Sequence, residues 1–210
     1  MLNTYLFDFD GTLVDSMPTF VRAMLKLLDD HGVKYGDDIV KIITPLGYGG
    51  SARYFQTLGL KLSVEEIIKE INDFAINEYA YNIPAKNNVV ETLKKLKNRG
   101  CDLNVLTASP HIMLDPCLKR IGIFDLFTNV WSCEDFNTTK ADLKIYELSA
   151  GKIGKKVDEI VFLDDNFNAC KTAKSAGMKV YGVYDKSSDE FVEDMKNLTD
   201  KYVFDFSELL

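Results

Sequence analysis

The chain has 210 residues, of which 46% are hydrophobic and 27% charged, a composition typical of a globular protein with one sizeable core. Its 32 acidic and 25 basic residues give a net charge of −7, which argues against a nucleic-acid binder that grips phosphates through clustered Lys and Arg. No apolar run reaches the roughly 18 residues of a membrane span, and no signal segment precedes the first strand pattern. We therefore expect a cytoplasmic protein with no membrane partner.

The first apolar run, residues 4–7, ends abruptly in Asp8 and lacks alternation, which suits a strand buried on both faces. Similar runs follow at residues 103–106, 129–131, 160–163 and 179–183, with a last strand and short turn expected in the tail, 202–210. Amphipathic helical patterns lie between them, over 89–97, 112–121, 143–152 and 168–176. This alternation predicts an α/β fold, a Rossmann-like three-layer core with a parallel sheet between helices.

Residues 17–83 break the alternation, because they show helical patterns and no convincing strand. The expected helices cover 20–31, 37–43, 52–58 and 64–81, separated by glycine-rich connections at Gly47, Gly49 and Gly50. Ser63 and Glu66 form a capping-box pattern at the start of the last helix. We interpret the segment as a small all-helical cap, residues 16–83, inserted after the first strand into a catalytic core of residues 1–15 and 84–210.

Four cysteines occur, none of them in a CxxC pair or beside a histidine at zinc-ligand spacing: Cys101, Cys117, Cys133 and Cys170. We expect free, buried thiols in a reducing compartment. His31 precedes Gly32 at an expected helix C-terminus, where a contact with the helix dipole is a sufficient explanation.

Ligands bind beyond the carboxyl ends of the strands in an open parallel sheet, so the polar residues there are the candidates for a site. The first strand leads into Asp8 and Asp10, and Gly11 permits a turn that lets both carboxylates face one point. The second strand ends in Thr107, whose hydroxyl can donate a hydrogen bond to a phosphoryl oxygen; a helix N-cap is the alternative role for such a threonine.

The fourth strand runs into two further acids, Asp164 and Asp165. Adjacent buried acids are costly unless a cation or a lysine compensates them. Hard oxygen ligands that converge on one point suit Mg²⁺, and Lys140, which precedes an expected helix, can offset the same charge. Acids at two strand ends therefore predict a magnesium site.

Four segments carry a family resemblance: DFDGTLVDS, NVLTAS, TKADLKIYELSAGKIG and VFLDDNFNACKTAKSAGMKVYGV. In this order and spacing they resemble the haloacid dehalogenase superfamily, in the subgroup with a helical cap after the first strand that includes phosphoglycolate phosphatase and β-phosphoglucomutase. The likeness covers nearly the whole chain. In the third segment, the prolines of the family's Lys-Pro-x-Pro stretch are replaced by Ala141 and Leu143.

The resemblance implies roles for the strand-end residues. Asp8 would be the nucleophile that forms an aspartyl-phosphate, and Asp10 the general acid and base. Thr107 and Lys140 would hold the phosphoryl oxygens, with Lys140 also paired to Asp8. Mg²⁺ would be bound by Asp165, Asp8 and the backbone carbonyl of Asp10, with Asp164 either a further ligand or a residue that supports the ligands.

These roles predict a Mg²⁺-dependent phosphatase for a small phosphorylated metabolite. Dehalogenases of this superfamily lack the second aspartate, because halide needs no proton on leaving, so Asp10 argues against that activity. A β-phosphoglucomutase-like phosphomutase is the main alternative, although residues 15–20 and 46–51 lack the histidine and arginine typical of those enzymes. A catalytically idle sensor of phosphorylated ligands is the other alternative.

Substrate selection is expected from the loop 45–53 of the cap, which contains Tyr48 and Arg53; an ordinary interhelical turn with a solvated Arg53 is equally compatible with the sequence. In the core, Gly11, Ala108 and Ser109 are the candidate substrate contacts. His111 is interpreted as a surface residue at a helix start, with a substrate contact as the alternative. The oligomeric state, monomer or dimer, stays open.

Overall fold

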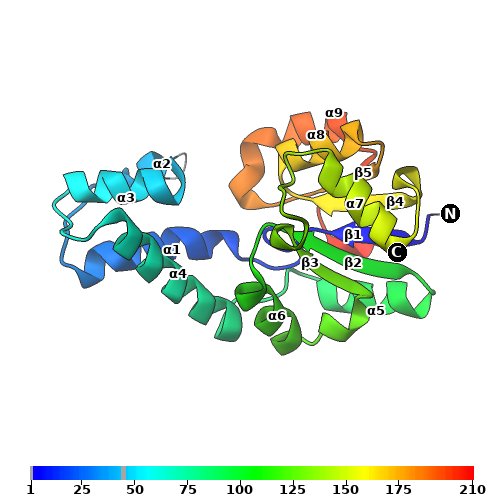
Figure 1. The fold of residues 1–210 in the computed structure, drawn as a ribbon, viewed down its shortest axis with the longest axis horizontal. Helices are drawn as coiled ribbons and strands as arrows, with labels where there is room; N and C mark the ends of the chain where they lie inside the picture. The colour runs from blue at the N-terminus through cyan, green and yellow to red at the C-terminus, as the bar shows by residue number, and fades with distance from the viewer. Residues whose placement is uncertain (1, 44–45) are drawn as a thin grey trace. The chain divides into compact units, whose positions relative to one another are not determined.

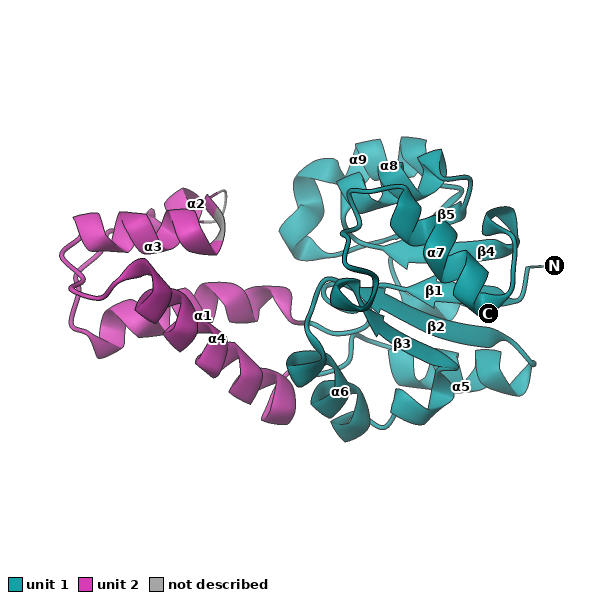
Figure 2. Ribbon diagram, viewed as in Figure 1, with its two compact units in different colours: residues 1–15, 84–210 teal, residues 16–83 magenta. Residues whose placement is uncertain are grey.

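The computed structural model describes residues 2–43 and 46–210. The chain forms two compact units (Figure 2), which are described separately. Unit 1 contains Met1–Asp15 and Pro84–Leu210, and unit 2 contains Ser16–Ile83.

Unit 1 is built on a six-stranded sheet in which every pairing is parallel. The strands are β1 (Thr4–Phe7), β2 (Asp102–Thr107), β3 (Asn129–Ser132), β4 (Ile160–Asp164), β5 (Lys179–Val183) and β6 (Lys201–Val203). Their spatial order, β3-β2-β1-β4-β5-β6, places β1 in the centre between β2 and β4. The α/β fold with a parallel sheet that the sequence predicts is thus confirmed.

Helices cover both faces of this sheet (Figure 1). They are α5 (Val89–Asn98), α6 (His111–Arg120), α7 (Lys144–Ile153), α8 (Phe167–Ser175) and α9 (Val192–Leu198), with short 3-10 turns η2 (Phe124–Leu126), η3 (Cys133–Phe136), η4 (Val157–Glu159), η5 (Lys186–Phe191) and η6 (Phe206–Leu209). Leu6 points into one core layer, with Tyr146 of α7 and Cys170 of α8. Phe7 points to the other side, where its ring stacks on Phe206. This alternation along β1 follows from the period of two in a strand.

The register of the sheet aligns the strand ends that carry polar residues. Phe7, the last residue of β1, is paired with Val105 of β2 and with Leu163 of β4. Asp8 therefore follows β1 at the same edge as Thr107 and Asp164, which end their own strands. Residues far apart in the sequence meet at this carboxyl edge.

Unit 2 consists of helices: α1 (Met17–Asp30), α2 (Ile39–Ile43), α3 (Gly47–Thr57) and α4 (Val64–Tyr81). Their apolar faces form a buried cluster of Ala23, Met24, Leu27, Leu28, Ile39, Ile43, Ala52, Phe55, Leu60, Ile67 and Ile71. Arg22 of α1 is paired with Glu78 of α4 at 3.1 Å. The capping box at the start of α4 is present: the Glu66 N–H donates to Ser63 Oγ at 3.1 Å, and the Ser63 N–H donates to Glu66 Oε2 at 2.8 Å.

The prediction that glycine-rich connections lie at Gly47, Gly49 and Gly50 is wrong. Gly47, Gly49 and Gly50 belong to α3, which begins five residues before the predicted start at Ala52. Glycine disfavours a helix by only about 1 kcal/mol per residue, and packing overrides so weak a preference. Here Ala52 and Phe55 are fully buried in the unit 2 cluster, and their burial stabilises the whole helix.

Two further expectations from the sequence concern membrane-spanning segments and the cysteine thiols. Within residues 2–43 and 46–210, no helix is both long enough and apolar enough to cross a membrane. The four cysteines are thiols that form no disulfide; Cys117, Cys133 and Cys170 are buried and Cys101 is half-buried. Burial raises the pKa of the Cys117 thiol to about 11, so this thiol is inert at neutral pH.

Candidate active site

Asp8 lies at the centre of the carboxyl edge of the sheet and is only 5% exposed. Its N–H donates to Leu163 O at 2.8 Å, which extends the pairing of β1 and β4 by one residue and fixes the direction of the side chain. Lys140 Nζ donates to Asp8 Oδ1 and also, at 2.8 Å, to Asp164 Oδ2. The lysine therefore bridges the ends of the two central strands.

Three buried carboxylates meet at this point. Asp8, Asp164 and Asp165 each offer an oxygen within 4.8 Å of the others. Burial raises the pKa of Asp8 well above its usual range, and the Asp164 carboxylate raises it further, while Lys140 acts in the opposite sense. Burial also raises the pKa of Asp165, as do Asp164 and Asp185.

This charge balance fits a bound cation. Burial would lower the pKa of Lys140, but the charges of Asp164 and Asp8 outweigh it and the pKa is raised well above the usual value, which favours the ammonium form. The Lys140 ammonium faces three buried carboxyl groups, so ionisation of all three would leave negative charge uncompensated in a site of low dielectric constant. A divalent ion with oxygen ligands compensates such a set.

Gly11 and Thr12 hold the third carboxylate in place. Thr12 Oγ1 donates to Asp165 Oδ1 at 3.0 Å and accepts from the Asp165 N–H at 3.1 Å, and its side chain is fully buried. Gly11 has φ +70°, and a Cβ placed there would lie 2.5 Å from Asp165 Oδ2. The loop after β1 thus needs glycine for its conformation and for the space that the Asp165 carboxylate occupies.

We expect Gly11→Ala to lower the free energy of unfolding by about 2 kcal/mol or more, because a left-handed backbone costs an L-residue about 1–2 kcal/mol before the collision with Asp165 is counted. Chemical denaturation measures this change. Gly154→Ala is the matched control: Gly154 has φ +76°, but an added Cβ meets nothing within 4 Å. Equal losses in the two variants would contradict the close approach of Asp165 to Gly11.

Asp10 lies beside the cluster and is more exposed than Asp8. Its Oδ2 accepts a hydrogen bond from Ser109 Oγ at 2.5 Å. Thr107 Oγ1 accepts from the Ser109 N–H at 3.0 Å, and both side chains are buried. The loop after β2 therefore presents a serine to Asp10, and Ala108 lies between the two hydroxyl residues.

Tyr146 positions the lysine that bridges the strands. Its hydroxyl lies against two backbone carbonyls, Lys140 O at 3.0 Å and Ala169 O at 3.1 Å, and the side chain is fully buried. Asn166 caps α8 by accepting from the Ala169 N–H, while Asp164 Oδ1 accepts from the Asn166 N–H at 2.7 Å. Sequence reasoning gave no role to Tyr146 or Thr12; a tyrosine in a helix that begins just after the lysine and a hydroxyl next to the acid-rich loop were the available signals.

His111 is the first residue of α6, as the sequence predicts, and it makes ion pairs there. Its Nδ1 lies 2.8 Å from Asp115 Oδ1 and its Nε2 lies 2.9 Å from Asp135 Oδ2. Both ring nitrogens can donate only in the imidazolium form. Hydrogen bonds to Asp115 and Asp135 accordingly raise the pKa of His111 above its usual value.

We expect His111→Asn to destabilise the protein more at pH 6 than at pH 9. A raised pKa in the folded state means that the stabilisation is complete below the unfolded pKa of about 6.5 and is lost as the pH rises through the folded value. Because the side chain is 40% exposed, the effect should stay below about 1 kcal/mol. Unfolding free energies of both proteins across this range measure it; a difference independent of pH would contradict the imidazolium bridge.

Tyr48 and Arg53, the candidate substrate contacts of the inserted segment, both lie in α3 of unit 2. The expected loop 45–53 is therefore helical from Gly47 onward, and Pro45 lies outside the described residues. Tyr48 packs against the buried cluster of unit 2, with its ring 5.9 Å from that of Phe20. Arg53 is exposed.

The family model of haloacid dehalogenase-like hydrolases matches residues 2–177 of the chain. The pyrophosphatase PpaX of Bacillus velezensis is 27% identical over 180 residues, which cover 85% of this chain and 81% of that protein. The phosphoglycolate phosphatase of Pectobacterium atrosepticum is 26% identical, with 84% of this chain and 78% of that protein covered. A structure from Thermotoga maritima, provisionally named β-phosphoglucomutase, superposes with a TM-score of 0.85 at 21% identity and covers 99% of this chain and 96% of its own.

Proposed function

Because the chain belongs to the haloacid dehalogenase-like hydrolases, we propose that it is a phosphatase that uses Mg²⁺ to hydrolyse a small phosphorylated metabolite through an aspartyl-phosphate at Asp8. The observation that carries the proposal is the position of Lys140, which bridges Asp8 and Asp164 at the carboxyl edge of the sheet. That arrangement places a fixed positive charge beside a carboxylate nucleophile. Phosphatase names among the relatives support the reaction class.

The carboxylates of Asp8, Asp164 and Asp165 are the groups that would hold the metal. When bound, Mg²⁺ supplies charge stabilisation to the phosphoryl group and favours the ionised form of the clustered acids. The backbone carbonyl of Asp10 is a further proposed ligand. Oxygen donors of this kind select Mg²⁺ over softer metals.

Asp8 and Asp10 share the covalent chemistry. A carboxylate oxygen of Asp8 attacks phosphorus, and the bond from phosphorus to the leaving oxygen breaks as Asp10 gives that oxygen a proton. Water then attacks the aspartyl-phosphate and passes a proton back to Asp10, which releases inorganic phosphate and restores the Asp8 carboxylate. Ser109, whose hydroxyl donates to Asp10 Oδ2, orients this acid and base.

The oxygens of the phosphoryl group need hydrogen-bond donors small enough to leave room for the group in the site. We assign them to Lys140 and to the loop after β2, where the buried Thr107 hydroxyl accepts from the Ser109 N–H and keeps its own proton to donate. Gly11 and Ala108 are assigned to substrate contact through their backbone. Tyr48 and Arg53 of unit 2 are the proposed specificity residues.

The test is a panel of phosphate monoesters and pyrophosphate, assayed for phosphate release with Mg²⁺ and with a chelator. We expect release from at least one small metabolite, and a loss of about a hundredfold or more when the metal is removed, because metal ions dominate charge stabilisation in phosphoryl transfer. Equal rates in both conditions would contradict the metal site. A panel with no substrate would contradict the phosphatase assignment.

Product analysis separates hydrolysis from phosphomutase activity, the alternative suggested by the similarity of fold to the Thermotoga maritima structure. A hydrolase releases inorganic phosphate in proportion to the substrate consumed. A mutase yields an isomeric sugar phosphate instead, with little free phosphate. Phosphorus NMR of the reaction distinguishes the two outcomes in one experiment.

A further inference from the structure

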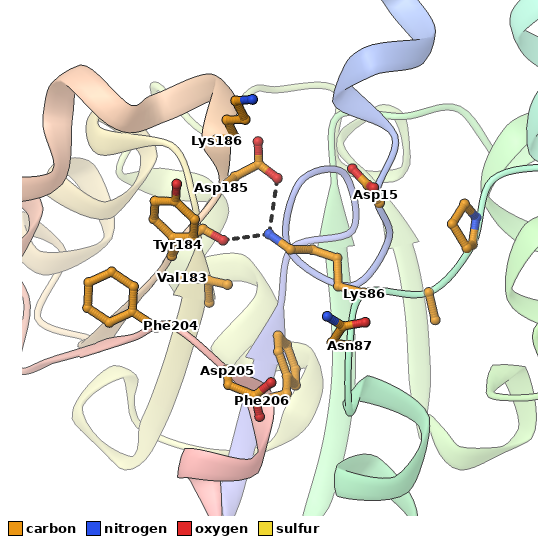
Figure 3. Close-up of a pocket in the computed structure, with 12 residues that line it drawn as sticks. Asp15, Lys86, Asn87, Val183, Tyr184, Asp185, Lys186, Phe204, Asp205 and Phe206 are labelled. Carbon is orange, nitrogen blue, oxygen red and sulfur yellow. Dashed lines mark hydrogen bonds and ion pairs between the residues drawn. The ribbon is translucent and has the colours of Figure 1, made fainter.

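Lys86 lies outside the carboxylate cluster, but its side chain reaches the loop that carries Asp10 and Gly11. Its Nζ donates to Gly11 O at 2.6 Å, to Tyr184 O at 2.5 Å and to Asp185 Oδ2 at 3.0 Å. The last two contacts are drawn in Figure 3. We propose that Lys86 is a positioning residue, whose ammonium fixes the Gly11 peptide and thereby the Asp165 carboxylate of the proposed metal site. The inference rests on the proposed function, which it deepens.

The backbone around Lys86 is attached to the same loop. The Lys86 N–H donates to Leu13 O and the Asp15 N–H donates to Pro84 O, both at 3.0 Å, so the two segments run side by side. Val14 and Ala85 form an antiparallel bridge between them. The lysine thus starts from a fixed backbone, and its side chain needs only to span from there to the Gly11 carbonyl.

The Gly11 carbonyl connects this anchor to Asp165. It belongs to the Gly11–Thr12 peptide, and Thr12 Oγ1 both donates to and accepts from Asp165. The Asp165 carboxylate also fills the space where a Cβ of Gly11 would lie. A rotation of this peptide would therefore move the hydroxyl that holds Asp165 and change the room available to its carboxylate.

The charge of Lys86 is paired with the buried carboxylate of Asp185, which also holds the ammonium near Gly11. Burial would raise the pKa of Asp185, but hydrogen bonds from Ser187 and the charge of Lys86 outweigh it and the pKa is lowered, so Asp185 is ionised. The Lys86 side chain is 19% exposed and that of Asp185 is 7% exposed, hence this pair is screened less than a surface pair. Loss of the lysine alone would leave a buried, unpaired carboxylate.

The ammonium lies in the wall of a cavity of about 470 Å³. Tyr184, Asp185, Lys186 and Phe204 belong to the same wall, as Figure 3 shows. Lys186 is exposed and lines the same cavity, so it is a matched control for charge. The cavity also gives a small alkylammonium ion a route to the space that a shortened side chain would vacate.

The experiment compares Lys86→Ala with the double variant Lys86→Met/Asp185→Asn. The double variant removes both charges of the pair, so no buried, unpaired carboxylate is left to destabilise the fold. Three measurements are made: the Mg²⁺ midpoint of thermal stabilisation without substrate, steady-state kinetics for kcat and KM, and amide exchange over residues 9–15 and 164–166. Lys186→Met is the control. Ethylammonium is added to Lys86→Ala as a replacement cation.

We expect the Mg²⁺ midpoint of both variants to rise by about tenfold or more, since residues that orient metal ligands are worth about 10–100-fold in affinity. The kcat should fall while KM changes by less than about threefold, because the substrate contacts are intact. Exchange should quicken in the two named segments but not in α4, and ethylammonium should restore part of the affinity. Lys186→Met should behave as the unchanged protein.

Two results would overturn the inference. The first is a Mg²⁺ midpoint that stays the same in both Lys86 variants although their thermal stability falls. The second is unchanged amide exchange at residues 9–15 and 164–166. Failure of the proposed function gives a different pattern. In that case the unchanged protein itself releases no phosphate from any ester, and the exchange measurement alone decides whether Lys86 holds the Gly11 loop.

Discussion

Asp8→Asn is expected to lower phosphatase turnover by about 10⁴-fold or more, in line with the removal of nucleophiles from other enzymes that form covalent intermediates. An amide cannot attack phosphorus to give an acyl phosphate. The variant should still fold, because asparagine has nearly the same volume, and Lys140 keeps Asp164 as a partner at 2.8 Å. Steady-state rates on the best substrate of the panel measure the effect.

The control for this variant is Asp158→Asn, which changes an exposed acid in η4 and should leave turnover unaltered. Mass spectrometry of acid-quenched protein adds a direct observation: the peptide that contains Asp8 should carry phosphate during turnover in the unchanged protein and none in the variant. A variant that retains most of its activity would remove Asp8 from the chemistry.

Asp10→Asn should separate substrates by their leaving groups. With an alkyl phosphate, whose leaving oxygen needs a proton, we expect a loss of about 10²–10⁴-fold, the usual range for general acid catalysis. With a nitrophenyl phosphate the first step needs no acid, so one equivalent of nitrophenolate should appear rapidly before slow turnover. The burst arises because hydrolysis of the aspartyl-phosphate still lacks its base.

Stopped-flow absorbance at the start of the reaction measures this burst. Ser109→Ala is the companion variant: it removes the hydrogen bond to Asp10 Oδ2 but leaves the carboxylate, so a smaller loss of about tenfold is expected. An equal loss on both substrates, with no burst, would show that Asp10 serves neither step.

The sheet could be predicted because its local signals agree with one another. Apolar runs without alternation marked strands buried on both faces, and helices with glycine ends lay between them, which admits few arrangements other than a parallel sheet. The start of α3 was missed for the opposite reason. Gly47 and Gly50 disfavour a helix locally, while burial of Phe55 within unit 2, which no local pattern shows, stabilises it.

The candidate site likewise has a part that local sequence patterns predict and a part that they do not. The sequence supplied the identities of Asp8, Asp10 and the acidic pair, since polar residues directly after buried strands are conspicuous. It could not identify the residues that hold these side chains in place. Tyr146 on the Lys140 carbonyl and Thr12 on Asp165 are buried contacts between segments distant in the chain.

By itself, the sequence determined the α/β class and the residues at the strand ends, because these depend on patterns within a few neighbouring positions. It also determined the family, because four such patterns follow one another in a fixed order. Only the tertiary structure decided that three carboxylates lie within 4.8 Å of one another, that Lys140 donates to Asp164 as well as to Asp8, and that Lys86 reaches the Gly11 carbonyl. These relations depend on the register of β1 between β2 and β4 and on side-chain reach across 75 residues of chain. Distances of that kind are set by packing, which local sequence does not encode.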